Sequence, residues 1–177
     1  GYEALNGVID AVSGYADGKG VRPNYREITR FTNKFNPNNH AEVVEVTYNK
    51  NLISFEDLMI HYLESHDPTQ LNRQGNDIGT QYRSIILFSN TAQKEKITQL
   101  LTEYQTLLSK EGFGAIQTVV KPLTKFYEAE NYHQDYIKKN PNGYCPDHST
   151  GVRFARTNSV KDFDNSILKE GKNIVVI

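Results

Sequence analysis

The sequence predicts a two-layer α+β fold, in which helices pack on a mixed, mostly antiparallel sheet. Residues 41–48 alternate apolar and polar side chains with a period of two, as in a strand with one buried face. Residues 91–109 instead repeat apolar side chains at helical spacing. Strands and helices follow one another without regular β-α-β alternation, which favours α+β over a doubly wound parallel sheet.

In the first third of the chain, we predict two strands and two helical segments. Residues 1–6 resemble the end of a helix, and residues 8–15 alternate loosely as a strand that ends in the glycine-rich turn 16–20. After the strand 41–48, Ser54 is a suitable N-cap for a helix. The apolar side chains that share one face of this helix are Phe55, Leu58, Met59, Tyr62 and Leu63.

The sequence of the rest of the chain predicts two further strands and two helices. We expect strands over residues 82–88 and 118–120, with the long helix 91–109 between them. A short helix over residues 128–138 should end before the Asn-Pro-Asn-Gly run at 140–143. The buried stripe of the long helix is expected to be Ile97, Leu100, Leu101, Tyr104 and Leu108.

A length of 177 residues is typical of one domain, which we place at residues 1–148. Residues 149–172 are polar and charged, so 149–177 is expected to be a tail or linker. It closes on the apolar, strand-like run 173–177, which needs a partner strand. This run either adds to the domain's own sheet or leads into a further domain.

Composition excludes several classes of function. The net charge is -1, with 20 basic and 21 acidic side chains, so no overall field favours nucleic acid or an anionic membrane. No apolar run approaches the ~18 residues of a membrane-spanning helix. A single cysteine excludes an internal disulfide, and the five histidines show no zinc-like spacing, so we expect no metal and no cofactor.

The most informative segment is the polar, glycine-punctuated run 66–84, which lies between the helix after Ser54 and an apolar strand. A loop of this length without its own secondary structure is either disordered or functional. The run is too varied for a low-complexity segment and both ends join buried elements, so we interpret it as a functional site.

This run resembles the signature of the peptide methionine sulfoxide reductase A family. The resemblance rests on His-Asp-Pro at 66–68 and on Gln-Gly-Asn-Asp-x-Gly-x-Gln-Tyr-Arg-Ser at 74–84, and it extends over about residues 2–145. Further matching blocks occur in the family's order. They are Gly7-Val8, Val12-Ser13-Gly14-Tyr15-Ala16, Asn24-Tyr25-Arg26-Glu27, His40-Ala41-Glu42, Phe126-Tyr127-Glu128-Ala129-Glu130, Tyr132-His133-Gln134-Asp135-Tyr136 and Asn140-Pro141-Asn142-Gly143-Tyr144-Cys145.

The resemblance implies reduction of free and peptidyl methionine-S-sulfoxide, as in repair of oxidative damage. A thiolate attacks the sulfur while Glu42 protonates the oxygen, and a carboxyl in a half-apolar pocket has the raised pKa that this role needs. Tyr25 and Tyr82 would hydrogen-bond the sulfoxide oxygen. Asp77 and His133 would hold the backbone of the substrate methionine.

The resemblance also implies how the thiol is recycled. Cys145 fits the resolving cysteine, which would attack the sulfenic acid to form a disulfide. A thioredoxin-type partner would then reduce that disulfide by exchange. We expect a monomer that binds neither nucleic acid nor membrane, and the need for a reductant favours the cytoplasm, with a periplasmic or secreted location left open.

Each of these residues also has an ordinary structural interpretation. By position alone, Glu42 would be a solvated edge carboxylate, and Tyr25 and Tyr82 half-buried aromatic residues. Asp77 would be a turn residue and Cys145 an incidental exposed thiol. Only the order of several motifs reverses these interpretations.

Two departures from the family pattern matter. The family's nucleophile lies in a Gly-Cys-Phe-Trp motif that these 177 residues do not contain, so we expect a fragment that does not turn over methionine sulfoxide alone. The alternatives are a non-catalytic module that binds oxidised methionine and, more weakly, a purely structural domain. In addition, the segment 30–39 is longer than the family's connection and ends in Asn39 where a glycine is usual. It could reshape the rim near Tyr25 or contact a protein substrate.

Overall fold

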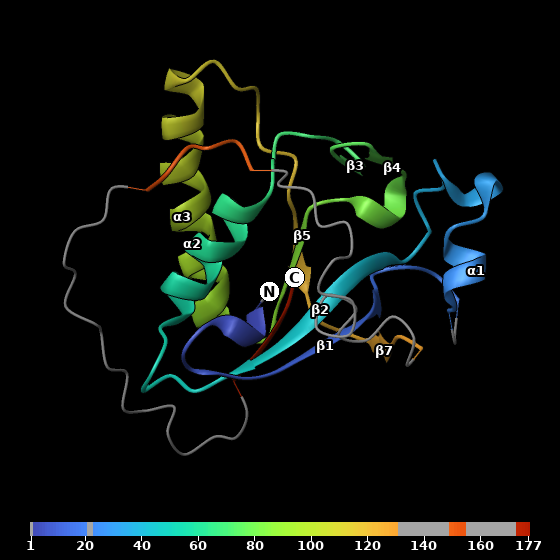
Figure 1. Ribbon diagram of the computed structural model, residues 1–177, viewed down its shortest axis with the longest axis horizontal. Helices are drawn as coiled ribbons and strands as arrows, with labels where there is room; N and C mark the ends of the chain where they lie inside the picture. The colour runs from blue at the N-terminus through green and yellow to red at the C-terminus, as the bar shows by residue number, and fades with distance from the viewer. Residues whose placement is uncertain (1, 21–22, 131–148, 155–172) are drawn as a thin grey trace.

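The computed structural model describes residues 2–20, 23–130, 149–154 and 173–177, and the fold in these ranges is α+β (Figure 1). Its centre is a six-stranded sheet with the strand order β6-β5-β8-β2-β1-β7. Helices α2 and α3 lie side by side next to this sheet, and the short helix α1 and the β3–β4 ribbon lie at its other end (Figure 1). The predicted fold class is confirmed. In these ranges no helix is both long and apolar enough to cross a membrane.

The sheet is built around the antiparallel pair of β1 (Val8–Ala16) and β2 (Ala41–Tyr48). The bounds of β2 are those that the period-two pattern predicts. Side chains alternate between the faces of a strand, so Val44, Val46 and Tyr48 point to the same side as Glu42. These three pack into the core that contains α2 and α3. Glu42 stands at the end of that row, where the cavity described below replaces the core.

The terminal strand β8 (Asn173–Val176) lies inside the sheet. It pairs antiparallel with β2 on one side and with β5 (Ile85–Phe88) on the other, and Val175 and Val176 are fully buried. The run 173–177 therefore adds to the domain's own sheet, the first of the two alternatives. The expected domain boundary at residue 148 stays a prediction, because it falls outside the described ranges.

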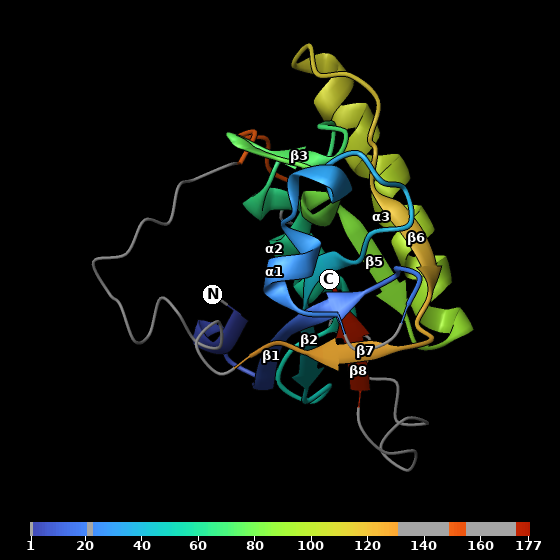
Figure 2. The same ribbon diagram turned by 90° about the vertical axis from the view of Figure 1, so that its right-hand side faces the viewer.

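The two long helices follow the sequence pattern closely (Figure 2). Helix α2 (Phe55–Ser65) begins after Ser54, whose hydroxyl oxygen accepts a hydrogen bond from the Asp57 amide at 2.9 Å. This capping contact satisfies an N–H group that has no partner within the helix. Helix α3 (Thr91–Lys110) buries four of its five predicted stripe residues, and Leu101 is only partly buried.

Three predicted elements differ from the structure. Residues 1–6 contain a 3-10 turn, η1 (Tyr2–Ala4), and the strand predicted from Tyr82 begins only at Ile85, since Tyr82 belongs to the 3-10 turn η3 (Thr80–Tyr82). Residue 128, where a helix was expected, ends strand β7 (Phe126–Glu128) instead, which pairs with β1. Residues 131–138 of that expected helix lie outside the described ranges.

Several short elements carried too little pattern to be predicted. Three surround the cavity, and their bounds are Tyr25–Ile28 for α1, Arg73–Gln74 for β3 and Asp77–Ile78 for β4. The turn η2 (Phe31–Asn33) lies within the long segment 30–39. The strand predicted over residues 118–120 is present as β6 (Val119–Pro122), which runs parallel to β5.

Candidate functional site

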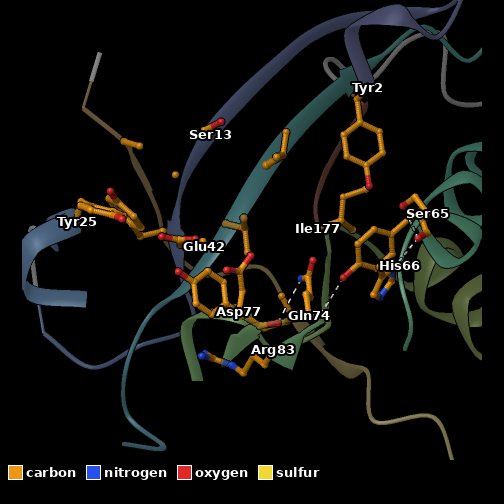
Figure 3. Close-up of a pocket in the computed structure, with 18 residues that line it drawn as sticks. Tyr2, Ser13, Tyr25, Glu42, Ser65, His66, Gln74, Asp77, Arg83 and Ile177 are labelled. Carbon is orange, nitrogen blue, oxygen red and sulfur yellow. Dashed lines mark hydrogen bonds between the residues drawn. The ribbon is translucent and has the colours of Figure 1, made fainter. Parts of the chain in front are cut away.

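A cavity of about 630 Å³ opens at the end of β2, beyond the row of core side chains (Figure 3). Four of the predicted site residues line it: Glu42 of β2, Asp77 of β4, Tyr82 of η3 and Tyr25 of α1. They come from segments that are far apart in sequence. The other two, His133 and Cys145, lie outside the described residues. A volume of this size is typical of a small-molecule site.

The carboxyl group of Glu42 is poised to exchange a proton near neutral pH. Burial disfavours its charged form, and the carboxylate of Asp77 adds repulsion, so the pKa of Glu42 rises from 4.5 to about 7. About half of the Glu42 side chains therefore carry a proton at pH 7. Such a group can act as a general acid at physiological pH.

Tyr82 supplies a hydrogen-bond donor to the same cavity. Burial, together with the nearby carboxylates of Glu42 and Asp77, raises the pKa of its phenol to about 12. The hydroxyl group thus stays protonated at all physiological pH values. It can donate a hydrogen bond to an oxygen that gains negative charge.

The backbone of Tyr25 is held at the rim by the carboxylate of Glu130, a residue of the 126–130 block to which the sequence analysis assigned no role. The Tyr25 amide donates to Glu130 Oε1 at 3.0 Å, and the Tyr15 hydroxyl donates to Glu130 Oε2 at 2.7 Å. Glu130 lies shortly after β7, and its two hydrogen bonds connect the first turn of α1 to β1. The long segment 30–39 has not displaced Tyr25, which still lines the cavity with 37 % of its surface exposed.

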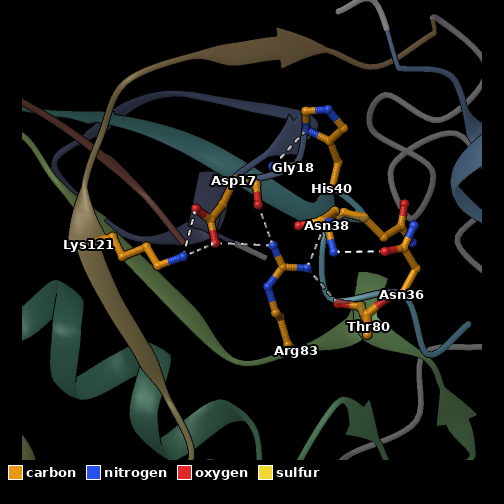
Figure 4. A network of polar contacts seen from close by, with 9 residues as sticks. Asp17, Gly18, Asn36, Asn38, His40, Thr80, Arg83 and Lys121 are labelled. Atoms are coloured by element: carbon orange, nitrogen blue, oxygen red, sulfur yellow. Dashed lines mark hydrogen bonds and ion pairs between the residues drawn. The ribbon is translucent and has the colours of Figure 1, made fainter. Parts of the chain in front are cut away.

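The turn that carries Tyr82 is fixed by the guanidinium group of Arg83 (Figure 4). One guanidinium nitrogen donates to the carbonyl oxygens of Thr80 at 2.8 Å and Asn39 at 3.0 Å. The other donates to the Asp17 carbonyl at 2.8 Å and forms an ion pair with its carboxylate, which Lys121 also contacts. This network ties η3 to the ends of β1 and β2 and explains why the strand cannot begin at Tyr82.

Gly79 completes the same turn. Its φ of +151° lies where side chains are rarely tolerated, and a Cβ at this position would collide with the side chain of Gln81. The glycine of the signature run is therefore required by the backbone that presents Tyr82.

The opposite wall contains a buried hydrogen-bonded chain that begins at His66. Its Nδ1 lies 2.7 Å from the Tyr62 carbonyl oxygen, which can only accept, so Nδ1 carries the proton. Nε2 then accepts from the Ser84 hydroxyl at 2.7 Å, and Ser84 lies 2.8 Å from the hydroxyl of Thr118. Burial lowers the pKa of His66, which keeps the ring neutral. His66 is thus a structural hydrogen-bonder.

No group of three or more His, Cys, Asp or Glu side chains in the described ranges is arranged to hold a metal ion. The polar side of the cavity consists of carboxyl groups and phenols instead. It can donate a proton and hydrogen bonds to a small polar group while the walls contributed by Val44 and Ile177 remain apolar.

Comparison with known proteins shows the family of the chain. A sequence profile described as peptide methionine sulfoxide reductase matches residues 1–163. The chain belongs to this family. The resemblance seen in the signature run is thereby confirmed.

Individual members of the family are similar over most of the chain. It is 49% identical over 146 residues to the peptide methionine sulfoxide reductase MsrA of Nautilia profundicola, a match that covers 81% of this chain and 78% of the relative. It is 45% identical over 148 residues to the mitochondrial peptide methionine sulfoxide reductase of Rattus norvegicus, covering 84% of this chain and 61% of the relative.

Solved structures of family members also superpose on this fold. The methionine sulfoxide reductase A of Corynebacterium diphtheriae matches with a TM-score of 0.75 at 40% identity, over 85% of this chain and 73% of that one. The reduced form of Mxr1 from Saccharomyces cerevisiae matches with a TM-score of 0.70 at 33% identity, over 84% of this chain and 80% of that one.

Proposed function

We propose that this chain forms the substrate pocket and supplies the acid for reduction of methionine-S-sulfoxide, free or within proteins. The observation that carries the proposal is the carboxyl group of Glu42, with a pKa of about 7, in a cavity that it shares with the protonated phenol of Tyr82. Membership of the peptide methionine sulfoxide reductase family supports it.

In the proposed reaction the sulfoxide oxygen lies between Glu42 and the two phenols. A thiolate attacks the sulfur, the S–O bond breaks, and the proton of Glu42 is transferred to the departing oxygen, so the ionised carboxylate is left behind. Tyr82 and Tyr25 donate hydrogen bonds to the oxygen as its charge grows. Asp77 and His133 hold the backbone of the substrate methionine.

The oxygen and the electrons are accounted for by two thiols and a reductant. The oxygen, which has left the substrate as hydroxide, then bonds to the sulfur of the first thiol while the S–S bond to the substrate breaks, so methionine is released and the first thiol becomes a sulfenic acid. The second thiol, proposed to be Cys145, condenses with the sulfenic acid to a disulfide and releases the oxygen as water. A thioredoxin-type dithiol then reduces the disulfide by exchange. With one cysteine, these 177 residues do not contain both thiols, so we propose that they do not turn over the sulfoxide by themselves.

Binding to the chain tests the pocket without any need for turnover. N-acetyl-methionine-S-sulfoxide methylamide should bind more tightly than the R epimer or the unoxidised methionine compound, as measured by titration calorimetry. Tyr82→Phe should weaken this binding about fivefold, because one hydrogen bond is worth ~1 kcal/mol. Tyr127→Phe is the matched control, since Tyr127 does not line the cavity. Equal affinity for both epimers and for the unoxidised compound would refute the pocket.

Activity tests the acid. A chain in which a Gly-Cys-Phe-Trp segment is joined ahead of residue 1 should show thioredoxin-dependent reduction, and Glu42→Gln should lower its rate on the order of 10²- to 10⁴-fold. An unchanged rate in this variant would exclude Glu42 as the acid. Turnover by the 177 residues alone would refute the assignment of the thiols. If the epimer is bound but the joined segment gives no reduction, the alternative of a non-catalytic binding module replaces this proposal.

A further inference from the structure

A second cavity of about 360 Å³ adjoins the first. The two share the side chains of Tyr25, Asp77 and Tyr82. The remaining lining residues come from the end of α1, the segment 30–39 and the β4–η3 region. They are Thr29, Lys34, Asn76, Ile78 and Gln81.

The segment 30–39 forms a fixed wall of this second cavity. The Thr80 amide donates to the Lys34 carbonyl at 2.8 Å, and the Thr80 hydroxyl donates to the Asn33 carbonyl at 3.0 Å. Arg83 holds the end of the segment through the Asn39 carbonyl at 3.0 Å. The backbone at Lys34 is therefore attached to the same turn that presents Tyr82 to the first cavity.

The lining combines a positive charge with exposed apolar surface. The ammonium group of Lys34 has no carboxylate within 4.0 Å in the described part of the chain, and it lies 5.8 Å from the centre of the Phe35 ring. Ile78, which lines the cavity, is 40 % exposed, and Phe35, which is next to Lys34 in the chain but does not line the cavity, is 72 % exposed. The carboxylate of Asp77 also lines this cavity, but the proposed function assigns it to the backbone of the substrate methionine. The ammonium group of Lys34 is then left for a neighbouring side chain that is partly apolar and negatively charged.

A methionine sulfoxide within a polypeptide enters the first cavity by its side chain, while its neighbours remain at the opening. Consecutive residues of an extended chain are only ~3.3 Å apart, so an adjoining residue must lie beside the shared wall of Tyr25 and Asp77. We propose that the second cavity holds the residue next to the methionine sulfoxide in a protein substrate, and that Lys34 favours an acidic side chain there. This inference rests on the proposed function.

Peptide binding to the 177-residue chain tests the inference. Acetylated and amidated tripeptides with methionine-S-sulfoxide at the centre would carry Asp, Ala or Lys on either side, one position at a time. At low salt, the peptide with Asp on one side should bind about threefold more tightly than the peptide with Ala there, and the peptide with Lys should bind more weakly than the peptide with Ala. A difference of about threefold is the size expected of a partly exposed ion pair. The advantage of Asp should disappear at 1 M salt.

Two substitutions locate the effect. Lys34→Gln should remove the preference for Asp, and Lys34→Glu should reverse it in favour of Lys. Lys110→Gln is the matched control, because it removes the same charge from the last turn of α3, away from α1 and the cavity (Figure 1). The preference should persist in this control.

The outcomes separate the inference from the proposed function. If the blocked methionine sulfoxide binds but Asp gives no advantage on either side, or if the advantage survives in Lys34→Gln, this inference is wrong and the proposed function stands. If the blocked methionine sulfoxide itself fails to bind in preference to methionine, the proposed function is wrong and this inference falls with it.

Discussion

The raised pKa of Glu42 predicts a measurable dependence of stability on pH. An unfolded chain exposes this carboxyl to water, where its pKa is 4.5, whereas the folded protein holds it at about 7. Each unit of difference between the two pKa values corresponds to ~1.4 kcal/mol. The free energy of unfolding should therefore be about 3 kcal/mol lower when Glu42 is ionised in both states than when it is protonated in both. Glu42→Gln removes the titrating proton and hence this loss.

The sign of the effect follows from proton uptake. Below pH 4.5 the group is protonated in both states, and its contribution to stability is fully present. Between pH 4.5 and about 7 only the folded state keeps the proton, so the contribution falls as the pH rises. Above pH 7 the loss is complete and constant.

Urea unfolding between pH 4 and pH 8.5 measures this contribution. The free energy of unfolding of Glu42→Gln minus that of the unmodified chain should increase by about 3 kcal/mol over this range and then level off. Glu45→Gln, a substitution on the same strand β2 outside the cavity, is the control for general effects of removing a carboxylate. A difference that stays constant from pH 4 to pH 8.5 would show that Glu42 is not held in a desolvated site.

Three further substitutions test the surroundings of the cavity. Asp77→Asn should lower the pKa of Glu42 but leave it above 4.5, because burial is the larger cause of the raised pKa. A carbon-13 NMR titration of the Glu42 carboxyl would detect this change. An unchanged midpoint would argue against the proximity of the two carboxyl groups. Arg83→Met should destabilise the fold by about 3 kcal/mol in urea unfolding, since the half-buried Asp17 then loses one ion-pair partner and η3 loses its anchor; a loss below 1 kcal/mol would contradict this. Ser54→Ala should cost about 1 kcal/mol in the same assay through loss of the α2 cap, and a neutral result would mean that solvent replaces it.

Local patterns in the sequence were sufficient for the elements that depend on local physics. The bounds of β2 follow from period-two alternation, and the start of α2 follows from the hydroxyl of Ser54. Both signals involve residues that are neighbours in sequence and require no knowledge of the rest of the fold. The four described candidate residues came instead from the resemblance to a known family, carried by several short motifs in the family's order, and they line one cavity.

Features that depend on distant partners could not be predicted. Tyr82 belongs to η3 because the side chain of Arg83 binds residues 17, 39 and 80, and no local pattern encodes those contacts. Glu130 acts on Tyr25 across 105 positions of sequence. The raised pKa of Glu42 was expected only through the family resemblance, because it depends on burial in a cavity that exists only once the sheet and the signature run have come together.

Strand β8 lies between β2 and β5 in the sheet but follows both of them in the chain. The sheet can therefore be completed only after β8 has been synthesised. The β1–β2 hairpin can form as soon as the ribosome has released it, and the β5–β6 pair soon after, but both then expose an unpaired edge. Two hydrogen bonds between Val44 and Ile177, of 2.7 and 3.0 Å, show how far the closing strand must reach back along the chain. At ~5–20 residues per second, the first hairpin would wait on the order of ten seconds for its partner. During synthesis, the nascent chain therefore contains two incomplete sheets, whose unpaired edges must be protected from aggregation.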